Sequence, residues 1–383
     1  MAEIRDQERE MNMNMSWYMP TRLITGLGCV KDSAKEFAKL GKSCLIVTGK
    51  HSAKACGALA DVEAALEKMG IIREIYDGIG QNPRLTDCME AAGQAIRMGA
   101  DFIVGIGGGS PLDAAKCIAV LAAHPGMAQE ELYALHWPNR PLPVAAVGTT
   151  AGTGSEVTKV AVITTPDGRK KSLNDEPLYP ALALGDPTYT RSLPELFTRS
   201  TAVDALAHCM ESYFGRLANV ISRAYAVQGI RLLLEQFKKR EAEGWEDMSL
   251  FDREVFYNAS IYGGLAINTT GTLFPHNIGY LLTEQYGVPH GTACAVFLQE
   301  FYQYNKEVVP ELTERFLKEI ACDEDTFLRT IRAVTPSCDI TVSEEKISEV
   351  HGRWIGNSSI KKCWGEFTPE QADGVLRRLF GEK

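Results

Sequence analysis

The sequence lacks the features of a membrane or secreted protein. No apolar run approaches the roughly 18 residues that a membrane-spanning helix needs. The first ten residues are charged, and Asn12, Asn14 and Ser16 interrupt the Met-rich stretch that follows, so no secretory signal is expected. We expect the start of the chain to be a frayed extension.

An excess of basic residues is also absent. The chain has 40 Lys and Arg against 49 Asp and Glu, which gives a formal net charge of −9. Such a chain has no positive footprint for phosphate backbones or anionic lipid. We therefore expect neither nucleic acid nor a membrane surface as a partner.

Closely spaced cysteine pairs are absent. The ten cysteines are scattered without any C-x-x-C pair, and several lie in apolar runs such as CIAVLAA. This pattern does not suit a disulfide scaffold and predicts reduced, mostly buried thiols in a cytoplasmic protein.

The chain does contain enough apolar residues for sizeable cores. Its 383 residues are 45% hydrophobic, which suggests two domains. The first part alternates short β-branched runs with helical patterns, as in an α/β domain with a doubly wound, mostly parallel sheet. Strands are expected at 44–48, 71–76, 101–105 and 142–147, with edge strands at 157–164 and 181–184 around the 166–168 turn. From about Ser192, amphipathic patterns such as 224–237 and 253–267 predict an all-helical domain. We divide the chain into a dinucleotide-binding domain, residues 1–190, and a helical metal-binding and substrate domain, residues 191–383.

Two glycine-rich loops follow predicted strands. Residues 105–110 read GIGGGS and open a helix, so backbone N–H groups and the helix N-terminus could receive a pyrophosphate. A tight strand-to-helix turn with a good cap explains the same residues. Residues 148–156, GTTAGTGSE, form a second such loop with hydroxyl groups. The literal G-x-G-x-x-G fingerprint is absent, but two loops at strand ends favour a nucleotide site.

Asp204 and His208 are four residues apart in a helical pattern with a buried face. Their side chains project from the same side, one turn apart, and could share one cation. A capping-box pattern from Thr201 to Asp204, with His208 a partly buried helix residue, also explains them, and these residues alone favour that interpretation.

Two further histidines, His276 and His290, favour the metal-site interpretation. The chain has seven histidines, and these two lie in apolar, glycine-flanked segments where an unpaired imidazole would be costly to bury. One carboxylate with three imidazoles suits a divalent transition metal such as Fe(II) or Zn(II).

Over nearly its whole length the sequence resembles the iron-containing, group III alcohol dehydrogenase family, which has a dehydroquinate-synthase-like fold. The resemblance rests on GIGGGSPLDAAK, TTAGTGSEVT, STAVDALAHCMESY, PHNIGY and VPHGTACA, in this order. It implies a cofactor and a metal in the cleft between the two domains. It also assigns the metal ligands to Asp204, His208, His276 and His290 and cofactor contacts to Gly107, Gly108, Gly109, Ser110, Asp113, Thr149, Thr150, Thr153 and Lys170.

The sequence departs from the family pattern after the first predicted strand. Where many members carry an acid that holds the adenosine ribose, this chain has Gly49, followed by Lys50, His51, Ser52 and Lys54. Without that carboxylate, and with cations and a hydroxyl nearby, a 2′-phosphate is attracted rather than repelled. We therefore predict NADP(H) rather than NAD(H), against the alternative that the lysines are ordinary solvated residues. We count Gly49, Lys50 and Ser52 among the cofactor-binding residues.

A second departure concerns proton transfer. Tyr280 stands four residues after His276, where several relatives have another histidine implicated in a proton relay. Tyr280, a water chain or the cofactor ribose could serve instead, and Tyr280 joins the four metal ligands as a candidate catalytic residue.

The resemblance implies hydride transfer between a nicotinamide cofactor and a small primary alcohol, diol or aldehyde, assisted by Fe(II) or Zn(II). It also implies a homodimer or a larger homo-oligomer. The alternatives are a lyase or cyclase of the dehydroquinate-synthase type on the same scaffold, or a metal-dependent hydrolase whose glycine loops are structural.

Overall fold

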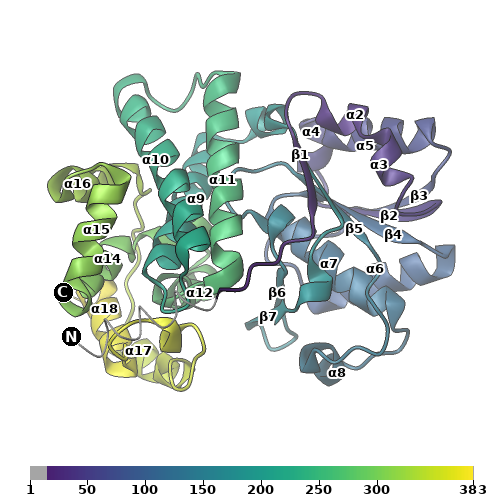
Figure 1. Ribbon diagram of the computed structural model, residues 1–383. Coiled ribbons are helices and arrows are strands. Elements are labelled where there is room, and N and C mark those ends of the chain that lie inside the picture. Colours follow the sequence, from purple (N-terminus) through teal and green to yellow (C-terminus); the bar gives the residue numbers. More distant parts are fainter. Residues whose placement is uncertain (1–14, 383) are drawn as a thin grey trace. The chain divides into compact units, whose positions relative to one another are not determined.

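The computed structural model describes residues 15–382 (Figure 1). The chain divides into two compact units. The α/β unit comprises Tyr18–Pro194 together with Met248–Tyr257. The helical unit comprises the described residues up to Trp17, Glu195–Asp247 and the residues from Asn258 onward. The chain therefore returns once to the α/β unit, at the start of the long helix α11 (Leu250–Thr270).

A six-stranded parallel sheet forms the centre of the α/β unit. Its strand order is β1-β8-β5-β4-β2-β3. The strands are β1 (Arg22–Thr25), β2 (Ser43–Thr48), β3 (Ile72–Tyr76), β4 (Phe102–Gly107), β5 (Val144–Gly148) and β8 (Leu182–Gly185). The helices of this unit are α2 (Cys29–Asp32), α3 (Ala34–Phe37), α4 (Ser52–Ala55), α5 (Ala58–Lys68), α6 (Leu85–Met98), α7 (Gly109–Ala123) and α8 (Gln129–Ala134).

Helices cover both faces of this sheet because successive strand residues point to opposite sides. Leu45 and Val47 of β2 pack in one apolar cluster with residues of α6 and α7. Cys44 and Ile46 of the same strand pack in a second cluster with residues of α2, α3 and α5. The predicted doubly wound parallel sheet is thus confirmed.

Two details of the predicted sheet were wrong. The segment 181–184 was expected at an edge, but β8 lies inside the sheet, because the short strand β1 pairs with its outer side. The segment 157–164 was expected to join the main sheet. Instead β6 (Val160–Thr164) pairs antiparallel with β7 (Lys170–Asn174) in a separate hairpin around the expected turn.

Strand order places the two glycine loops. The chain runs outward from β2 to β3 and then returns to β4 on the other side of β2, so the sheet reverses direction between β2 and β4. In open α/β sheets, ligands bind at the carboxyl ends of the strands at such a reversal. Gly49 follows β2 and Gly108 follows β4 at this place.

The second unit is helical, as expected. Its helices are α9 (Glu195–Phe214), α10 (Val220–Glu243), the later part of α11, α12 (Phe274–Tyr286), α13 (His290–Ala295), α14 (Leu298–Val308), α15 (Pro310–Ile320), α16 (Glu324–Val334), α17 (Glu344–Val350) and α18 (Pro369–Phe380). Short 3₁₀ turns complete both units, at Ser155–Val157, Glu176–Leu178, Pro187–Ser192, His351–Arg353 and Ile360–Lys362. Within residues 15–382, no helix has the length and apolar character to span a bilayer. All ten cysteines are free, and most of them are buried.

Candidate metal centre and cofactor loops

Helix α9 carries three of the polar side chains at the centre of the helical unit. Asp204, His208 and Glu211 all lie on its buried part. Their spacings of four and three residues place them along one side of the helix. Burying several polar groups on one helix costs folding free energy unless each finds a partner. We therefore take these three residues as the start of a candidate metal site.

Two glycines allow close contacts between helices, Gly291 between α13 and α9, and Gly279 between α12 and α13. A Cβ at Gly291 in α13 would lie 1.9 Å from the Ser200 carbonyl oxygen and 2.7 Å from the Asp204 Cβ. A Cβ at Gly279 in α12 would lie 2.7 Å from the carbonyl oxygen of Ala293. Any larger residue would force these backbones apart. The glycine after His290 therefore allows α13 to approach α9 closely enough for His290 to reach Asp204.

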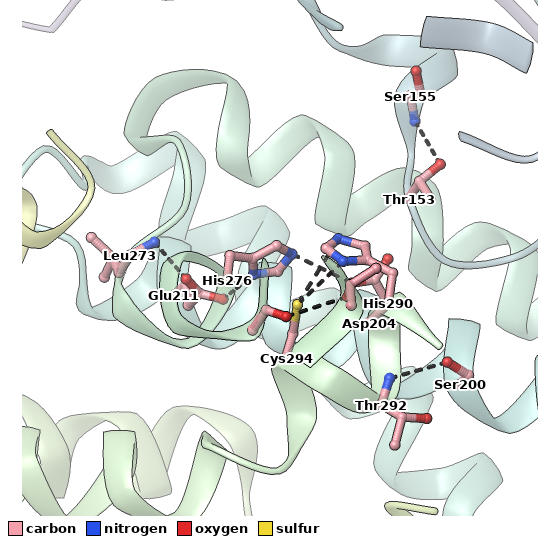
Figure 2. A network of polar contacts seen from close by, with 12 residues as sticks. Thr153, Ser155, Ser200, Asp204, Glu211, Leu273, His276, His290, Thr292 and Cys294 are labelled. Atoms are coloured by element: carbon pink, nitrogen blue, oxygen red, sulfur yellow. Dashed lines mark hydrogen bonds and ion pairs between the residues drawn. The ribbon is translucent and has the colours of Figure 1, made fainter. Parts of the chain in front are cut away.

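Four donor side chains converge at this crossing (Figure 2). One ligand atom from each of Asp204, His276, His290 and Cys294 lies within 4.8 Å of the others. His276 Nε2 is 3.4 Å from Asp204 Oδ1. Cys294 Sγ lies 3.8 Å from Nδ1 and 3.9 Å from Nε2 of His290. The structure thus brings together three of the four predicted ligands and adds a thiol.

His208, the fourth predicted ligand, lies beside this group. Its ring stacks on that of His276, with centroids 4.5 Å apart and an interplanar angle of 21°. Among the described residues, the group of mutually close donor atoms does not include it. Burial by itself would raise the pKa of the Asp204 carboxyl, but the charges of His208, His276 and His290 hold that pKa below its usual range. Asp204 is therefore an anion facing imidazoles.

Glu211 contacts His276 at Nδ1, the ring nitrogen that does not face Asp204. This carboxylate is fully buried, and it accepts a hydrogen bond from the Leu273 N–H and contacts His276 Nδ1 (Figure 2). Because an ionised carboxylate only accepts, the proton of the contact belongs to His276 Nδ1. In the neutral ring the lone pair is then on Nε2, which faces Asp204 and could bind a metal ion in place of a second proton.

The donor set fits a cation. Asp204 Oδ1 and His276 Nε2 are buried, and neither has a hydrogen-bond partner in the described structure. Burying polar atoms without a hydrogen bond is expensive, and here each has only the 3.4 Å ion-pair contact with the other. Burial lowers the pKa of His276, but Cys294 and Glu211 outweigh this effect and raise it well above its usual range, while burial raises the pKa of the Cys294 thiol to about 11. A divalent cation on these atoms would satisfy all of them.

Tyr280 lies next to this centre. Its ring stacks on His290, with centroids 5.7 Å apart and an interplanar angle of 12°. The tyrosine therefore contacts a predicted ligand with its ring face, one helical turn after His276 on α12.

In the α/β unit, the two glycine loops pack directly on one another. The Thr149 N–H donates to the Gly107 carbonyl at 2.9 Å. A Cβ at Gly108 would lie 2.9 Å from Thr150 Oγ1, and a Cβ at Gly109 would lie 2.9 Å from Thr153 Cγ2. These glycines are needed for the close approach of the two loops. The predicted cofactor residues of both loops thus form one surface at the end of β4 and β5.

Buried charges hold the second loop in place. The carboxylate of Asp113 accepts from Ser155 Oγ at 2.7 Å and from the Val162 N–H at 2.9 Å. The fully buried Lys116 ammonium donates to Ser155 Oγ at 2.8 Å and to the Val160 carbonyl at 2.7 Å. Burial raises the pKa of Asp113, and Lys116 is the largest opposing influence. Asp113, a predicted cofactor contact, therefore links α7 to the second glycine loop. Both oxygens of its carboxylate accept hydrogen bonds from the protein.

The remaining predicted cofactor residues lie around the ends of β2 and β6. Lys50 lines an open cavity of about 620 Å³ in the α/β unit, together with the 78–82 turn, Arg84, Asp87 and Thr164. Gly49 precedes it, and a Cβ there would lie 3.1 Å from the Ile79 carbonyl oxygen. Ser110 accepts from the Asn82 N–H at 3.3 Å. Ser52 is exposed at the start of α4, and Lys170 pairs with Thr164 in the hairpin.

Three polar residues of these sites were not found from the sequence. Glu211 could have been found from its spacing of seven residues after Asp204, which repeats the same helix face. Cys294 follows His290 by four residues and could have been found in the same way. Lys116 gave no signal, because a lysine in the second turn of a helix is ordinarily solvated.

A parallel sheet with glycine loops at its carboxyl edge and a helical unit with a carboxylate and imidazole cluster define a class of two-unit oxidoreductases. Residues 20–187 match the family model described as iron-containing alcohol dehydrogenase, and residues 198–348 match the model of the C-terminal part of the same family. The chain belongs to the iron-containing alcohol dehydrogenase family. This membership makes it an NAD(P)-dependent alcohol dehydrogenase.

Named relatives support this family membership. Alcohol dehydrogenase 4 of Schizosaccharomyces pombe is 34% identical over 292 residues, 76% of this chain and 68% of the relative. The 1,3-propanediol dehydrogenase of Klebsiella pneumoniae is 35% identical over 277 residues, 71% of this chain and 70% of the relative. The crystal structure of an iron-containing alcohol dehydrogenase from Thermotoga maritima superposes with a TM-score of 0.89 at 32% identity and covers 96% of this chain and 99% of its own.

Proposed function

We propose that the chain interconverts small primary alcohols or diols and their aldehydes, with NADP(H) as the preferred cofactor and a divalent metal ion held by Asp204, His276 and His290. The observation that carries this proposal is the pair of buried ligand atoms, Asp204 Oδ1 and His276 Nε2, which form no hydrogen bond and lie 3.4 Å apart as an ion pair. His208 is retained as a further ligand. A relative named lactaldehyde reductase, from Escherichia coli, supports a small hydroxyaldehyde or diol as substrate.

The residues of the centre have separate tasks in this reaction. Asp204, His276 and His290 hold the cation, and Glu211 fixes the tautomer and orientation of His276. A bound divalent ion supplies Lewis acidity toward the substrate oxygen. Tyr280, stacked on His290, is the candidate for moving the hydroxyl proton. The chain needs no covalent nucleophile.

The α/β unit holds the nucleotide. Backbone N–H groups at Gly108 and Gly109 lie at the N-terminus of α7, where a pyrophosphate is stabilised by unpaired donors and the helix dipole. The hydroxyls of Thr150 and Thr153 border these glycines. Gly107, Ser110, Thr149 and Lys170 complete the proposed contact set, and Asp113 acts on it by holding Ser155.

The preference for NADP(H) rests on the cavity after β2. Lys50 and Arg84 both line it, whereas Lys54 pairs with Asp77 at 3.0 Å and is directed to that partner. Gly49 leaves little room for an acidic side chain, because its Cβ would crowd the Ile79 carbonyl. A 2′-phosphate would therefore meet the Lys50 ammonium and the Arg84 guanidinium. Because Arg84 is paired with Asp87, the one acid of the lining, at 2.8 Å, Lys50 is the main attraction.

The cofactor preference is tested by kcat/KM for NADP(H) and NAD(H) in the wild type and in Lys50→Glu. We expect the wild type to favour NADP(H) and the variant to lose that preference by about tenfold or more, since one charge-assisted phosphate contact is worth about 1.5–3 kcal/mol. Lys54→Glu is the matched control, and its preference should change little. A wild type that favours NAD(H) would contradict the assignment.

The reaction is tested on a panel of alcohols, diols and aldehydes, with elemental analysis of the purified protein. We expect net formation or consumption of NADPH absorbance, and loss of both metal and turnover in His276→Ala. Nicotinamide binding without net turnover would favour the lyase or cyclase alternative, and absence of nucleotide binding by calorimetry would favour the hydrolase. Light scattering would show whether the chain forms the expected homodimer or larger assembly.

A further inference from the structure

Cys294 is a buried thiol that neither the sequence pattern nor the proposed reaction uses. We propose that its sulfur is an inner-sphere ligand of the cation held by Asp204, His276 and His290, and that this ligand makes the chain bind Zn(II) in preference to Fe(II). The proposal rests on the metal site proposed above and assigns that site its metal selectivity.

Helix geometry brings the sulfur to the site. Cys294 follows His290 by one turn on α13, so the two side chains lie on the same side of the helix. The Gly291 contact with Ser200 and Asp204 presses this helix on α9. Figure 2 shows the Cys294 sulfur between the rings of His276 and His290, on the side that faces Asp204.

The distances match those between ligands of one metal ion. Two nitrogen or oxygen ligands about 2.1 Å from Zn(II) at a tetrahedral angle lie about 3.4 Å apart, and a nitrogen and a sulfur ligand lie about 3.6 Å apart. His276 Nε2 and Asp204 Oδ1 are 3.4 Å apart, and Cys294 Sγ is 3.8 Å from His290 Nδ1. The sulfur is therefore close enough to Asp204, His276 and His290 to share one ion with them, since one ligand atom of each residue lies within 4.8 Å of the others.

The surroundings of the thiol support ligation. Cys294 is fully buried, and its polar contacts include the imidazoles of His276 and His290. Asp204 and His276, whose Oδ1 and Nε2 are buried and form no hydrogen bond, belong to the same group of close donor atoms as Cys294. Ligation forms a metal–sulfur bond and releases the thiol proton to solvent, with no change of oxidation state.

A second buried cysteine shows that burial alone does not produce this arrangement. Cys209 is fully buried on α9 beside His208, yet it lies outside the group of donor atoms around Asp204. Burial is the sole cause that raises its pKa. Cys209 therefore provides a matched control, a buried thiol next to the site but directed elsewhere.

Sulfur changes which metal the site prefers. Divalent affinity generally rises from Fe(II) to Zn(II) for a given set of ligands, and a soft thiolate donor suits Zn(II) better than the hard oxygen and water ligands that it replaces. A site with Asp204, imidazoles and Cys294 should therefore take Zn(II) from an equal mixture with Fe(II) more completely than the same site without sulfur.

The test uses the full chain, stripped of metal and reloaded with Co(II) without oxygen. The wild type and Cys209→Ala should show an intense near-ultraviolet sulfur-to-cobalt charge-transfer band, and Cys294→Ala and Cys294→Ser should lack it. Competition between equal Zn(II) and Fe(II) should give a bound Zn/Fe ratio that falls by about tenfold in both Cys294 variants.

Cys294→Ser retains the size and polarity of the side chain, so it serves where Cys294→Ala does not fold. A wild type without the band, or Cys294 variants that keep it and the wild-type ratio, would overturn the proposal while leaving the metal site intact. If His276→Ala still bound cobalt in full with an unchanged spectrum, the metal site itself would be wrong. The two failures are thus distinguishable.

Discussion

Replacing Glu211 with glutamine tests whether this carboxylate prepares His276 for metal binding. The side chain is fully buried and serves two groups, the Leu273 N–H and His276 Nδ1. Glutamine has the same shape but only one acceptor oxygen. Its amide nitrogen must then face either the Leu273 N–H or the His276 Nδ1–H, so one buried donor is left unsatisfied.

The magnitude follows from the kind of contact that is lost. Removal of a carboxylate that orients a ligating histidine typically weakens metal affinity by about 10–100-fold. At about 1.4 kcal/mol for each factor of ten, this is about 1.4–2.8 kcal/mol of binding free energy. The Zn(II) dissociation constant of Glu211→Gln, measured by competition with a chromophoric chelator, should rise by that factor.

Glu156→Gln is the matched control for this measurement. Glu156 is a buried carboxylate of the α/β unit that accepts a hydrogen bond from the Tyr257 hydroxyl at 2.7 Å, so its replacement also perturbs a buried acid. It should change stability but leave the Zn(II) dissociation constant alone. A folded Glu211→Gln protein whose dissociation constant stays within about twofold of the wild type would refute the reasoning.

Two further predictions concern the α/β unit. Lys116→Met should lower the free energy of unfolding by about 3–5 kcal/mol in urea titrations, because it leaves Asp113 buried without its cation. Burial lowers the pKa of Lys116 to about 8 in the folded protein, from 10.5. Between these values the unfolded chain binds more protons, so the stability of the wild type relative to Lys116→Met should rise with pH from about 8 to 10 and stay flat below 8; a flat difference throughout would contradict the burial argument. Gly108→Ala should weaken NADPH binding by about tenfold in calorimetry, since its Cβ would lie 2.9 Å from Thr150 Oγ1, whereas Gly352→Ala, with open space around it, should bind normally.

The parts of the fold that local pattern determines could be predicted from the sequence. Runs such as CLIVT, buried on both faces, gave β2 and β4, and the change of pattern near Ser192 gave the helical unit. Strand β1 could not be found, because two of its four residues are exposed and the other two are only partly buried. The interior position of β8 depends on β1, and strand order is set by contacts between segments distant in the chain.

In the candidate site, too, the relations within one helix could be predicted, whereas contacts between distant segments could not. Asp204 and His208 share one helix, so their relation is visible in the spacing, whereas the approach of His290 to Asp204 depends on α13 crossing α9 at Gly291. Cys209 and Cys294 show most clearly how far residue spacing can predict the site. Both follow a predicted ligand histidine within one helical turn, and both are fully buried, yet only Cys294 joins the donor group. At a spacing of one residue, the side chain of Cys209 projects about 100° away from His208, whereas a spacing of four residues returns Cys294 to the direction of His290. Helical phase therefore explains which thiol faces the metal site once the helix boundaries are known, and α13 is a six-residue helix whose existence the apolar run around it did not reveal.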